Sequence, residues 1–239
     1  MTLQEVMAEL ASMGDDNTKK VLTRHGAREP FYGVKVQDLK KIQKRVKKDY
    51  PLSMQLFNTG NSDAMYLAGL IADEQKMTKE DLNRWAEGAY WYYLSEYTVA
   101  WIAAESRYGW ELATEWINSQ KENIASTGWA TLSSLVAIRD DSDLDLKRLE
   151  SLLDRVAKEL LDAPNRIRYT MNGFVIACGS YVPALTEKAK RIAGAVGVVS
   201  VDMGGTACKV PDAVNTIEKV EQKGRLGTVS YTHLRAHET

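Results

Sequence analysis

The chain has 239 residues, of which 44% are hydrophobic and 26% are charged, and its formal net charge is −1. That length and apolar content suit one large globular domain or one repeat array with ample core. The sequence has no apolar run of about 20 residues and no signal peptide, so we expect a cytoplasmic protein that does not contact a membrane. Two cysteines, and one histidine before the C-terminal segment, argue against a disulfide framework, a histidine-ligated metal and a Ser-His-Asp triad.

Helical periodicity runs along almost the whole chain, and the breaks carry helix-start signals. Thr78 with Asp81 resembles a capping box. Prolines stand where a first helical turn tolerates them: Pro51, Pro164, Pro183 and Pro211. We predict helices at about residues 2–13, 17–25, 37–48, 51–58, 62–73, 79–89, 91–104, 107–118, 121–138, 143–162, 166–180, 183–195 and 211–223.

The short joints between these helices and the lack of strand alternation predict an all-α fold, an α-solenoid or superhelix of antiparallel helix pairs. Residues 196–201 form the one β-like run, and we assign them to an extended connection.

The N-terminal region carries a dense positive charge. Between Asn17 and Tyr50 there are eleven cations and three anions. Apolar residues recur at helical spacing from Val36 to Val46, so one stripe of that helix packs inward. The remaining circumference is cationic: Lys40, Lys41, Lys44, Arg45, Lys47 and Lys48. Like charges four residues apart each cost about 0.2–0.5 kcal/mol, and a polyphosphate partner would remove that cost. A solvated lysine-rich face is the alternative.

Aromatic residues are concentrated between residues 85 and 116. Tyr92 and Glu96 lie one helical turn apart, on a face where they meet either a ligand or plain solvent. The positions predicted to be core by their helical spacing are Tyr90, Leu94, Tyr97, Trp101 and Ala104.

Two stretches, Phe31-Tyr-Gly-Val-Lys-Val-Gln-Asp-Leu-Lys-Lys and Thr59-Gly-Asn-Ser-Asp-Ala-Met-Tyr-Leu-Ala-Gly-Leu-Ile-Ala-Asp73, resemble the DNA alkylation repair family. These proteins are DNA glycosylases built from HEAT-like helical repeats. The resemblance covers roughly residues 5–225 and is strongest at 31–73. It implies HEAT-like antiparallel helix pairs and hydrolysis of the N-glycosidic bond of N3- or N7-alkylated purines. It also implies a monomer that binds double-stranded DNA without a cofactor or a metal.

The family motif Trp-Trp-Asp-x-x-Asp matches Trp91-Tyr92-Tyr93-Leu94-Ser95-Glu96. The resemblance gives Glu96 the place of the catalytic carboxylate and Tyr92 the place of the aromatic residue that packs on the modified nucleotide. A carboxylate is needed because the sugar develops oxocarbenium character as the base departs. Tyr92 retains a cation–π surface for a positively charged base.

Two positions depart from the family pattern. The catalytic-site Arg falls near Gly128, and the second cleft Trp falls near Gly173. Either neighbouring side chains substitute for them or the alignment slips by one residue. The expected DNA contacts are Lys40, Lys41, Lys44, Lys48, Trp91, Trp129, Arg166, Arg168 and Asn172.

Three functions stay open on this basis. The first is a DNA glycosylase, the second a catalytically silent module that binds DNA structure, and the third a protein-interaction solenoid.

Residues 228–239 resemble a translated sequencing-adapter tail. We therefore expect one HEAT-like domain over residues 1–227, followed by a non-native segment that replaces the native C-terminus.

Charge reversal tests the basic helix. Replacing Lys40, Lys44 and Lys48 together by Glu should weaken duplex DNA binding, because a phosphate that no longer meets a cation keeps its condensed counterions. The slope of log affinity against log salt should flatten by about 0.9 for each phosphate that is no longer neutralised. Unchanged affinity and slope in a folded triple variant would exclude this face as the DNA contact.

Overall fold

The computed structural model describes residues 1–228, and every regular element within them is helical. The predicted all-α fold is therefore confirmed for that range, whereas residues 229–239 of the adapter-like segment lie outside the described residues. The α-helices are α1 (Leu3–Ser12), α2 (Asp16–Arg24), α3 (Val36–Val46), α4 (Tyr50–Asn58), α5 (Ser62–Ile71), α6 (Lys79–Gly88), α7 (Ala100–Glu105), α8 (Gly109–Trp116), α9 (Glu122–Ile138), α10 (Leu146–Glu159), α11 (Asn165–Tyr181), α12 (Thr186–Val196) and α13 (Ala213–Gln222). Shorter elements are η1 (Tyr93–Val99), which is π-helical, and the 3₁₀ turns η2 (Asp141–Asp143), η3 (Leu160–Asp162) and η4 (Pro183–Leu185).

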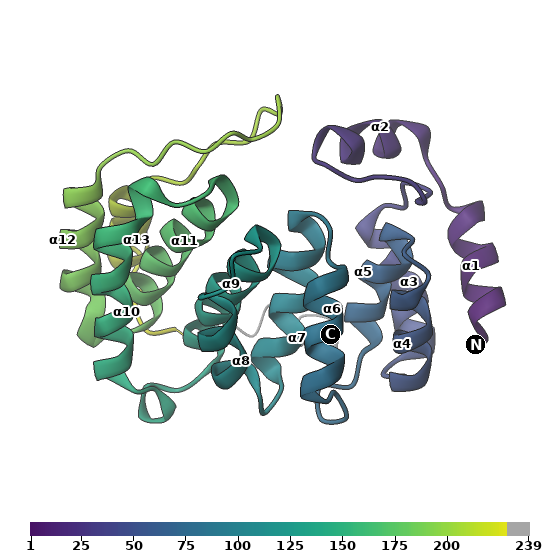
Figure 1. Ribbon diagram of the computed structural model, residues 1–239, viewed down its shortest axis with the longest axis horizontal. Helices are drawn as coiled ribbons and strands as arrows, with labels where there is room; N and C mark the ends of the chain where they lie inside the picture. The colour runs from purple at the N-terminus through teal and green to yellow at the C-terminus, as the bar shows by residue number, and fades with distance from the viewer. Residues whose placement is uncertain (229–239) are drawn as a thin grey trace.

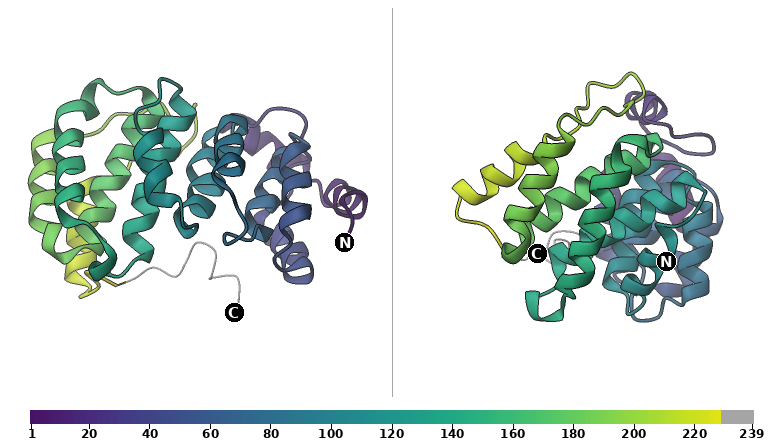
Figure 2. Two further views of the ribbon diagram at one scale, coloured as in Figure 1. Left: turned by 60° about the horizontal axis from the view of Figure 1, so that its bottom comes forward. Right: turned by 60° about the vertical axis from the view of Figure 1, so that its left-hand side comes forward.

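The helices stack side by side from the N-terminal end to the C-terminal end (Figures 1 and 2). A central row consists of α5, η1 with α7, α9, α11 and α13, each in contact with the next. Helices α4, α8 and α12 pack against members of this row as partners of α5, α9 and α11. Neighbours in sequence are thus neighbours in space, as the predicted array of antiparallel pairs requires.

The apolar core forms two clusters joined through α9. Ile124, at the start of α9, belongs to the N-terminal cluster, which includes the stacked rings of Phe57 and Trp85 at 4.2 Å. Trp129, five residues further along α9, packs against Phe174 in the C-terminal cluster. The long α9 therefore holds the two halves of the array together.

Local sequence explains where the helices begin. Thr78 and Asp81 form the predicted capping box of α6. Asn61 caps α5, where its side-chain oxygen accepts from the N–H groups of Asp63 and Ala64. Pro51 lies in the first turn of α4, as predicted.

The largest local difference between the predicted and the observed helices lies at residues 91–104, where we predicted a single helix. The structure divides this stretch into η1 and α7. A π-helical segment changes which side chains share a face, so the α-helical spacing that paired Tyr92 with Glu96 does not apply here. Tyr92 is half-buried, whereas Glu96 is buried.

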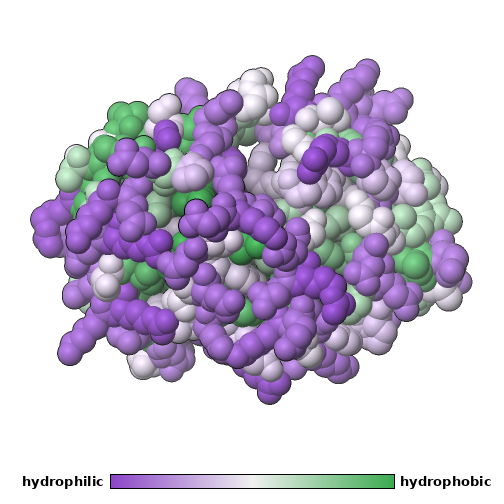
Figure 3. Space-filling view, in the orientation of Figure 1, coloured by the Kyte–Doolittle hydropathy of each residue, from purple (hydrophilic) through white to green (hydrophobic). Residues whose placement is uncertain are grey.

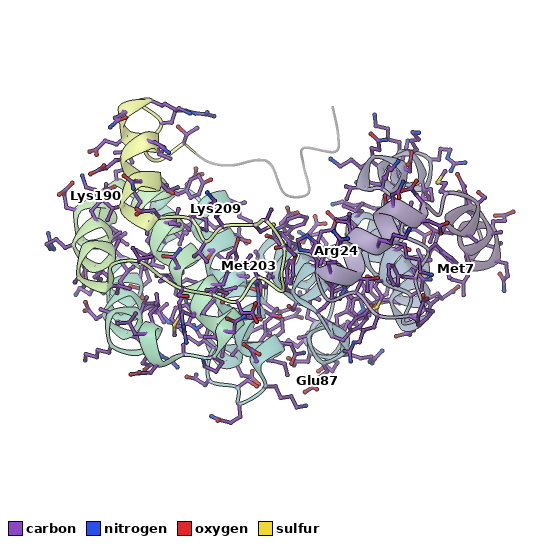
Figure 4. All side chains as sticks on the ribbon, turned by 90° about the horizontal axis from the view of Figure 1, so that it is seen from above. Met7, Arg24, Glu87, Lys190, Met203 and Lys209 are labelled. Atoms are coloured by element: carbon purple, nitrogen blue, oxygen red, sulfur yellow. The ribbon has the colours of Figure 1, made fainter. Side chains whose placement is uncertain are left out.

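Residues 197–212 connect α12 to α13 without a helix or strand. The expected extended connection at 196–201 is thus found at 197–201, whereas Val196 ends α12. This connection reaches α2: a Cβ placed on Gly204 would lie 3.0 Å from the Arg24 carbonyl oxygen. Met203 and Arg24 are seen close together in Figure 4. The C-terminal part of the chain therefore touches its second helix.

Buried Asp63 fixes the loop between α2 and α3. Its carboxylate accepts hydrogen bonds from the backbone N–H groups of Tyr32, Gly33 and Val34 at 2.6, 3.0 and 3.0 Å. These donors would have no partner without it, because the segment is largely shielded from water. The strongest stretch of the family resemblance, 31–73, contains both sides of this contact.

Large apolar side chains that are exposed in residues 1–228 lie on separate elements: Met1, Val21, Leu146, Leu161 and Val198. The face seen in Figure 3 is mostly hydrophilic, with scattered apolar residues. Within the same range no helix is both long enough and apolar enough to span a membrane.

Asp63→Ala should lower the free energy of unfolding by about 2–4 kcal/mol, because it leaves buried N–H donors without their charged acceptor. Chemical denaturation measures this value. Asp16→Ala, at an exposed aspartate in the first turn of α2, is the matched control, and its effect should stay near 0.5 kcal/mol or below, as about expected for surface sites. Equal effects of the two substitutions would contradict the role given to Asp63.

Candidate functional site

Glu96, the candidate catalytic carboxylate, is engaged in a buried ion pair. The residue is 5% exposed and lies in η1. Its Oε1 accepts from Arg166 Nε at 2.8 Å, and its Oε2 accepts from Arg166 Nη2 at 2.5 Å. Both carboxylate oxygens therefore face one guanidinium in a bidentate arrangement.

Arg166 is itself held from several sides. Its guanidinium carbon lies 4.3 Å from the ring centroid of Tyr92 and 4.3 Å from that of Tyr169. The backbone N–H of Arg166 donates to Glu122 Oε1 at 2.7 Å. Met203 Sδ lies 3.8 Å from Arg166 Nη1. Position 166, predicted as a DNA contact, is thus the cation that neutralises the candidate catalytic residue.

Tyr92 connects this site to the N-terminal part of the chain. Its Oη lies 2.5 Å from Nδ1 of His25, the C-cap residue that follows α2. Burial raises the pKa of Tyr92 to about 12. The phenol therefore stays protonated at neutral pH and can share a hydrogen bond with the imidazole.

The electrostatic state of Glu96 follows from two opposing effects. Burial raises the pKa of Glu96, and the hydrogen bonds and positive charge of Arg166 oppose that rise. The side chains of Glu96 and Arg166 are only 3% and 16% exposed, so water screens the pair weakly. Glu96 therefore acts as the counterion of Arg166.

Three predicted DNA contacts are buried in the structure. Trp129 is 0% exposed and belongs to the C-terminal core, so it has no surface with which to touch DNA. Trp91 is 6% exposed, and its indole N–H donates to Ser62 Oγ at 3.1 Å. Asn172 is 3% exposed, and its Nδ2 donates to the Pro211 carbonyl at 2.9 Å. Burial makes these three side chains structural in this conformation.

Arg168 also has a structural partner. Its Nη1 donates to the Ser200 carbonyl at 2.9 Å, and its Nη2 donates to the Ala163 carbonyl at 3.0 Å. Asn165 and Asp202 exchange two further hydrogen bonds, at 2.8 and 2.7 Å. Together with Asn172, these residues fasten the 197–212 connection to α11.

The two glycines that depart from the family pattern have different surroundings. A Cβ on Gly128 would lie 2.7 Å from Ile117 N and 2.9 Å from Ala113 O, so this residue permits the close approach of α9 and α8. Position 128 faces the core, and no cleft side chain is missing there. A Cβ on Gly173 would meet nothing within 4 Å.

The basic helix α3 keeps part of its predicted charge exposed. Lys41 pairs with Asp38, and Lys48 pairs with Glu74, at 2.7 and 2.6 Å. Lys44 is exposed and Lys40 is half-buried, and neither takes part in an ion pair among residues 1–228. Helix α3 lies at the N-terminal end of the array, away from α11, so the structure does not join these lysines to the Glu96 site (Figure 1).

Sequence reasoning missed His25 and Tyr169. His25 follows α2 and meets Tyr92 through a contact between residues 67 positions apart, which local sequence patterns do not reveal. Tyr169 is three residues after Arg166, a spacing that places both on one helical face and that could have suggested the stack. Within residues 1–228, no group of three or more His, Cys, Asp or Glu residues could hold a metal ion.

The chain is similar to proteins with known sequences and structures. The family model of the DNA alkylation repair enzyme matches residues 6–190. An uncharacterized protein of Listeria monocytogenes and one of Listeria innocua are each 36% identical over 229 residues, which are 93% of this chain and 99% of each relative.

One solved structure has a TM-score of 0.89 and 36% identity, and the match covers 95% of this chain and 97% of that one. It is described as "a new family of proteins related to the HEAT-like repeat DNA glycosylases with affinity for branched DNA structures". The predicted HEAT-like fold is thereby confirmed. The chain belongs to the DNA alkylation repair enzyme family.

Proposed function

We propose that this protein binds branched DNA and does not hydrolyse N-glycosidic bonds. The observation that carries the proposal is the buried bidentate pair between Glu96 and Arg166. A carboxylate lowers the barrier to base loss only when its charge faces the developing oxocarbenium ion. In this site the Glu96 carboxylate faces the guanidinium of Arg166, a positive charge that belongs to the protein itself.

The binding part of the proposal rests on charge and on the structural relative. Exposed cations lie on separate elements, including Lys44 on α3, Arg24 on α2 and Lys209 in the 197–212 connection. A branched DNA directs the phosphates of its arms along different lines, so separated cations can each meet a different arm. The relative's described affinity for branched DNA supports the same substrate class. We propose a monomer that contacts the double-stranded arms.

Glycosylase activity on alkylated purines is the second candidate. It is favoured by the stack of Tyr92, Arg166 and Tyr169 beside Glu96. A DNA phosphate that attracted Arg166 would free the carboxylate, and it would also uncover the faces of Tyr92 and Tyr169 for a cationic base. This mechanism requires the ion pair to open on binding.

The protein-interaction solenoid receives less support. Partner surfaces generally present a contiguous apolar patch. The large exposed apolar side chains of residues 1–228 are instead dispersed over different elements.

Base release separates the two candidates. In single-turnover reactions on duplexes that carry 7-methylguanine or 3-methyladenine, wild-type protein should release no base above the spontaneous rate, because Glu96 is neutralised. The same preparation should bind a four-way junction more tightly than a duplex of equal length. Glu96→Gln is the matched control, since it keeps the side-chain size and removes the charge. Release by wild type that Glu96→Gln abolishes would establish the glycosylase instead.

The ion pair itself can be tested by its pH dependence. Arg166→Met should lower the free energy of unfolding by about 3–5 kcal/mol at pH 8, because it leaves a buried charge unpaired. Without Arg166 the pKa of Glu96 rises further above its value in the unfolded chain. Such a carboxyl group stabilises the fold below its unfolded pKa, and that contribution disappears as the pH rises through the folded pKa. The destabilisation should therefore be smaller at pH 5.

The double variant Glu96→Gln/Arg166→Met removes both charges and serves as the control. Its stability difference from wild type should not grow in this way between pH 5 and pH 8. Equal destabilisation by Arg166→Met at the two pH values, measured by chemical denaturation, would show that Glu96 is not the anion that Arg166 neutralises.

A further inference from the structure

A small cavity opens in the central row beside the ion pair. It has a volume of about 250 Å³ and lies between η1 with α7, α9 and α11. We call it the Gly173 cup. Its main lining residues are Tyr97, Trp101, Ser133, Tyr169, Gly173 and Tyr181. Glu96 borders the cup as well, so the cup and the ion pair share a wall.

Gly173 keeps the cup open without being required by the fold. It lies inside α11, where glycine is less stable than alanine. Its φ is not positive, and an added Cβ would touch no neighbour within 4 Å. Neither backbone conformation nor helix packing therefore explains a glycine at this position. A larger side chain there would instead fill the cup.

The chemistry of the lining selects a flat, uncharged ligand. Four aromatic side chains surround the cup, and the rings of Tyr97 and Trp101 meet edge to face at 5.4 Å. Ser133 and Ser134 also line the cup, and the Ser133 hydroxyl, which donates to the Trp129 carbonyl at 2.9 Å, can still accept a hydrogen bond. Neither lysine nor arginine occurs among the described lining residues, and the one carboxylate is neutralised by Arg166. A phosphate has no cation to meet here, whereas a flat aromatic ring with polar edges can contact aromatic side chains and serine hydroxyl groups.

We propose that the Gly173 cup receives one unpaired nucleobase from the branch point of a bound DNA. The inference rests on the proposed DNA-binding function and names the feature of branched DNA that the protein reads. Bases at a branch point that lack a partner leave the stack at little cost. Stacking on aromatic side chains then compensates for the missing neighbours and tolerates any base, because every base has a π face.

The experiment compares two three-way junctions that differ only at the branch. One is fully paired, and the other carries two unpaired nucleotides, one of which is 2-aminopurine. Wild-type full-length protein should bind the unpaired junction about tenfold more tightly, and binding should change the 2-aminopurine fluorescence. The free 2-aminopurine deoxyriboside at the same concentration should show no change, which identifies the base within DNA as the ligand.

Gly173→Leu fills the cup and should remove both the preference and the fluorescence change. Its affinity for the fully paired junction should stay within about twofold, since the cup is not a phosphate contact. Gly194→Leu is the matched control. Gly194 also lies inside a helix, α12, and an added Cβ there also meets nothing within 4 Å. This variant should keep the preference, and thermal unfolding should show both variants folded.

The outcomes separate the cup from the DNA-binding function. Tight binding of both junctions by wild type without a preference overturns the cup while the proposed function stands. The role of the cup is also overturned if folded Gly173→Leu still prefers the unpaired junction. The same holds if Gly194→Leu loses this preference as well. Failure of wild type to bind either junction more tightly than duplex overturns the proposed function itself.

Discussion

The bidentate contact between Glu96 and Arg166 is the interaction on which the centre of this molecule depends. It joins η1 to α11 across the row of central helices, and so it connects residues 70 positions apart. The stack of Tyr92 and Tyr169 on the guanidinium extends the contact to both sides. Through Tyr92 and His25 it reaches α2, and through Met203 it reaches the 197–212 connection. Without Arg166 the carboxylate of Glu96 would be a buried and unpaired charge, which is costly because the interior offers no water to replace the partner.

The same contact changes the chemistry that the family scaffold can support. The alignment that we propose gives Glu96 the position of the family's catalytic Asp, and in the structure both oxygens of this carboxylate face Arg166. Several side chains that were predicted to contact DNA likewise form hydrogen bonds within the protein. Arg168 and Asn172 donate to backbone carbonyls of the 197–212 connection, and Trp91 donates to Ser62. The DNA-binding surface that we propose therefore consists of exposed cations on several elements and the Gly173 cup. This surface would recognise the branched form of the DNA rather than its base sequence.

Gly128 and Gly173, the two glycines near the site, have different structural roles. Gly128 is required because backbone atoms of α8 leave no room for a Cβ. An added Cβ on Gly173 would meet no neighbouring atom, and alanine at this position would make the helix more stable. In the sequence both were simply positions where a family side chain was absent. Only the distances to neighbouring elements distinguish a packing glycine from one that leaves a cavity.

The sequence by itself determined the helices, their order and the family scaffold. Apolar periodicity, prolines in first turns and capping residues such as Thr78 act over a few residues, so they can be read locally. The candidate site was predicted less well, since the sequence named Glu96, Tyr92 and Arg166 separately but did not pair them. That pairing depends on a contact between positions 96 and 166 and on the π-helical segment η1, in which Glu96 is buried. Burial of Trp129 and Asn172 likewise follows from how α9, α11 and the 197–212 connection pack. Contacts between distant segments produce no periodic pattern of residues in a single sequence, so only the tertiary structure decided them.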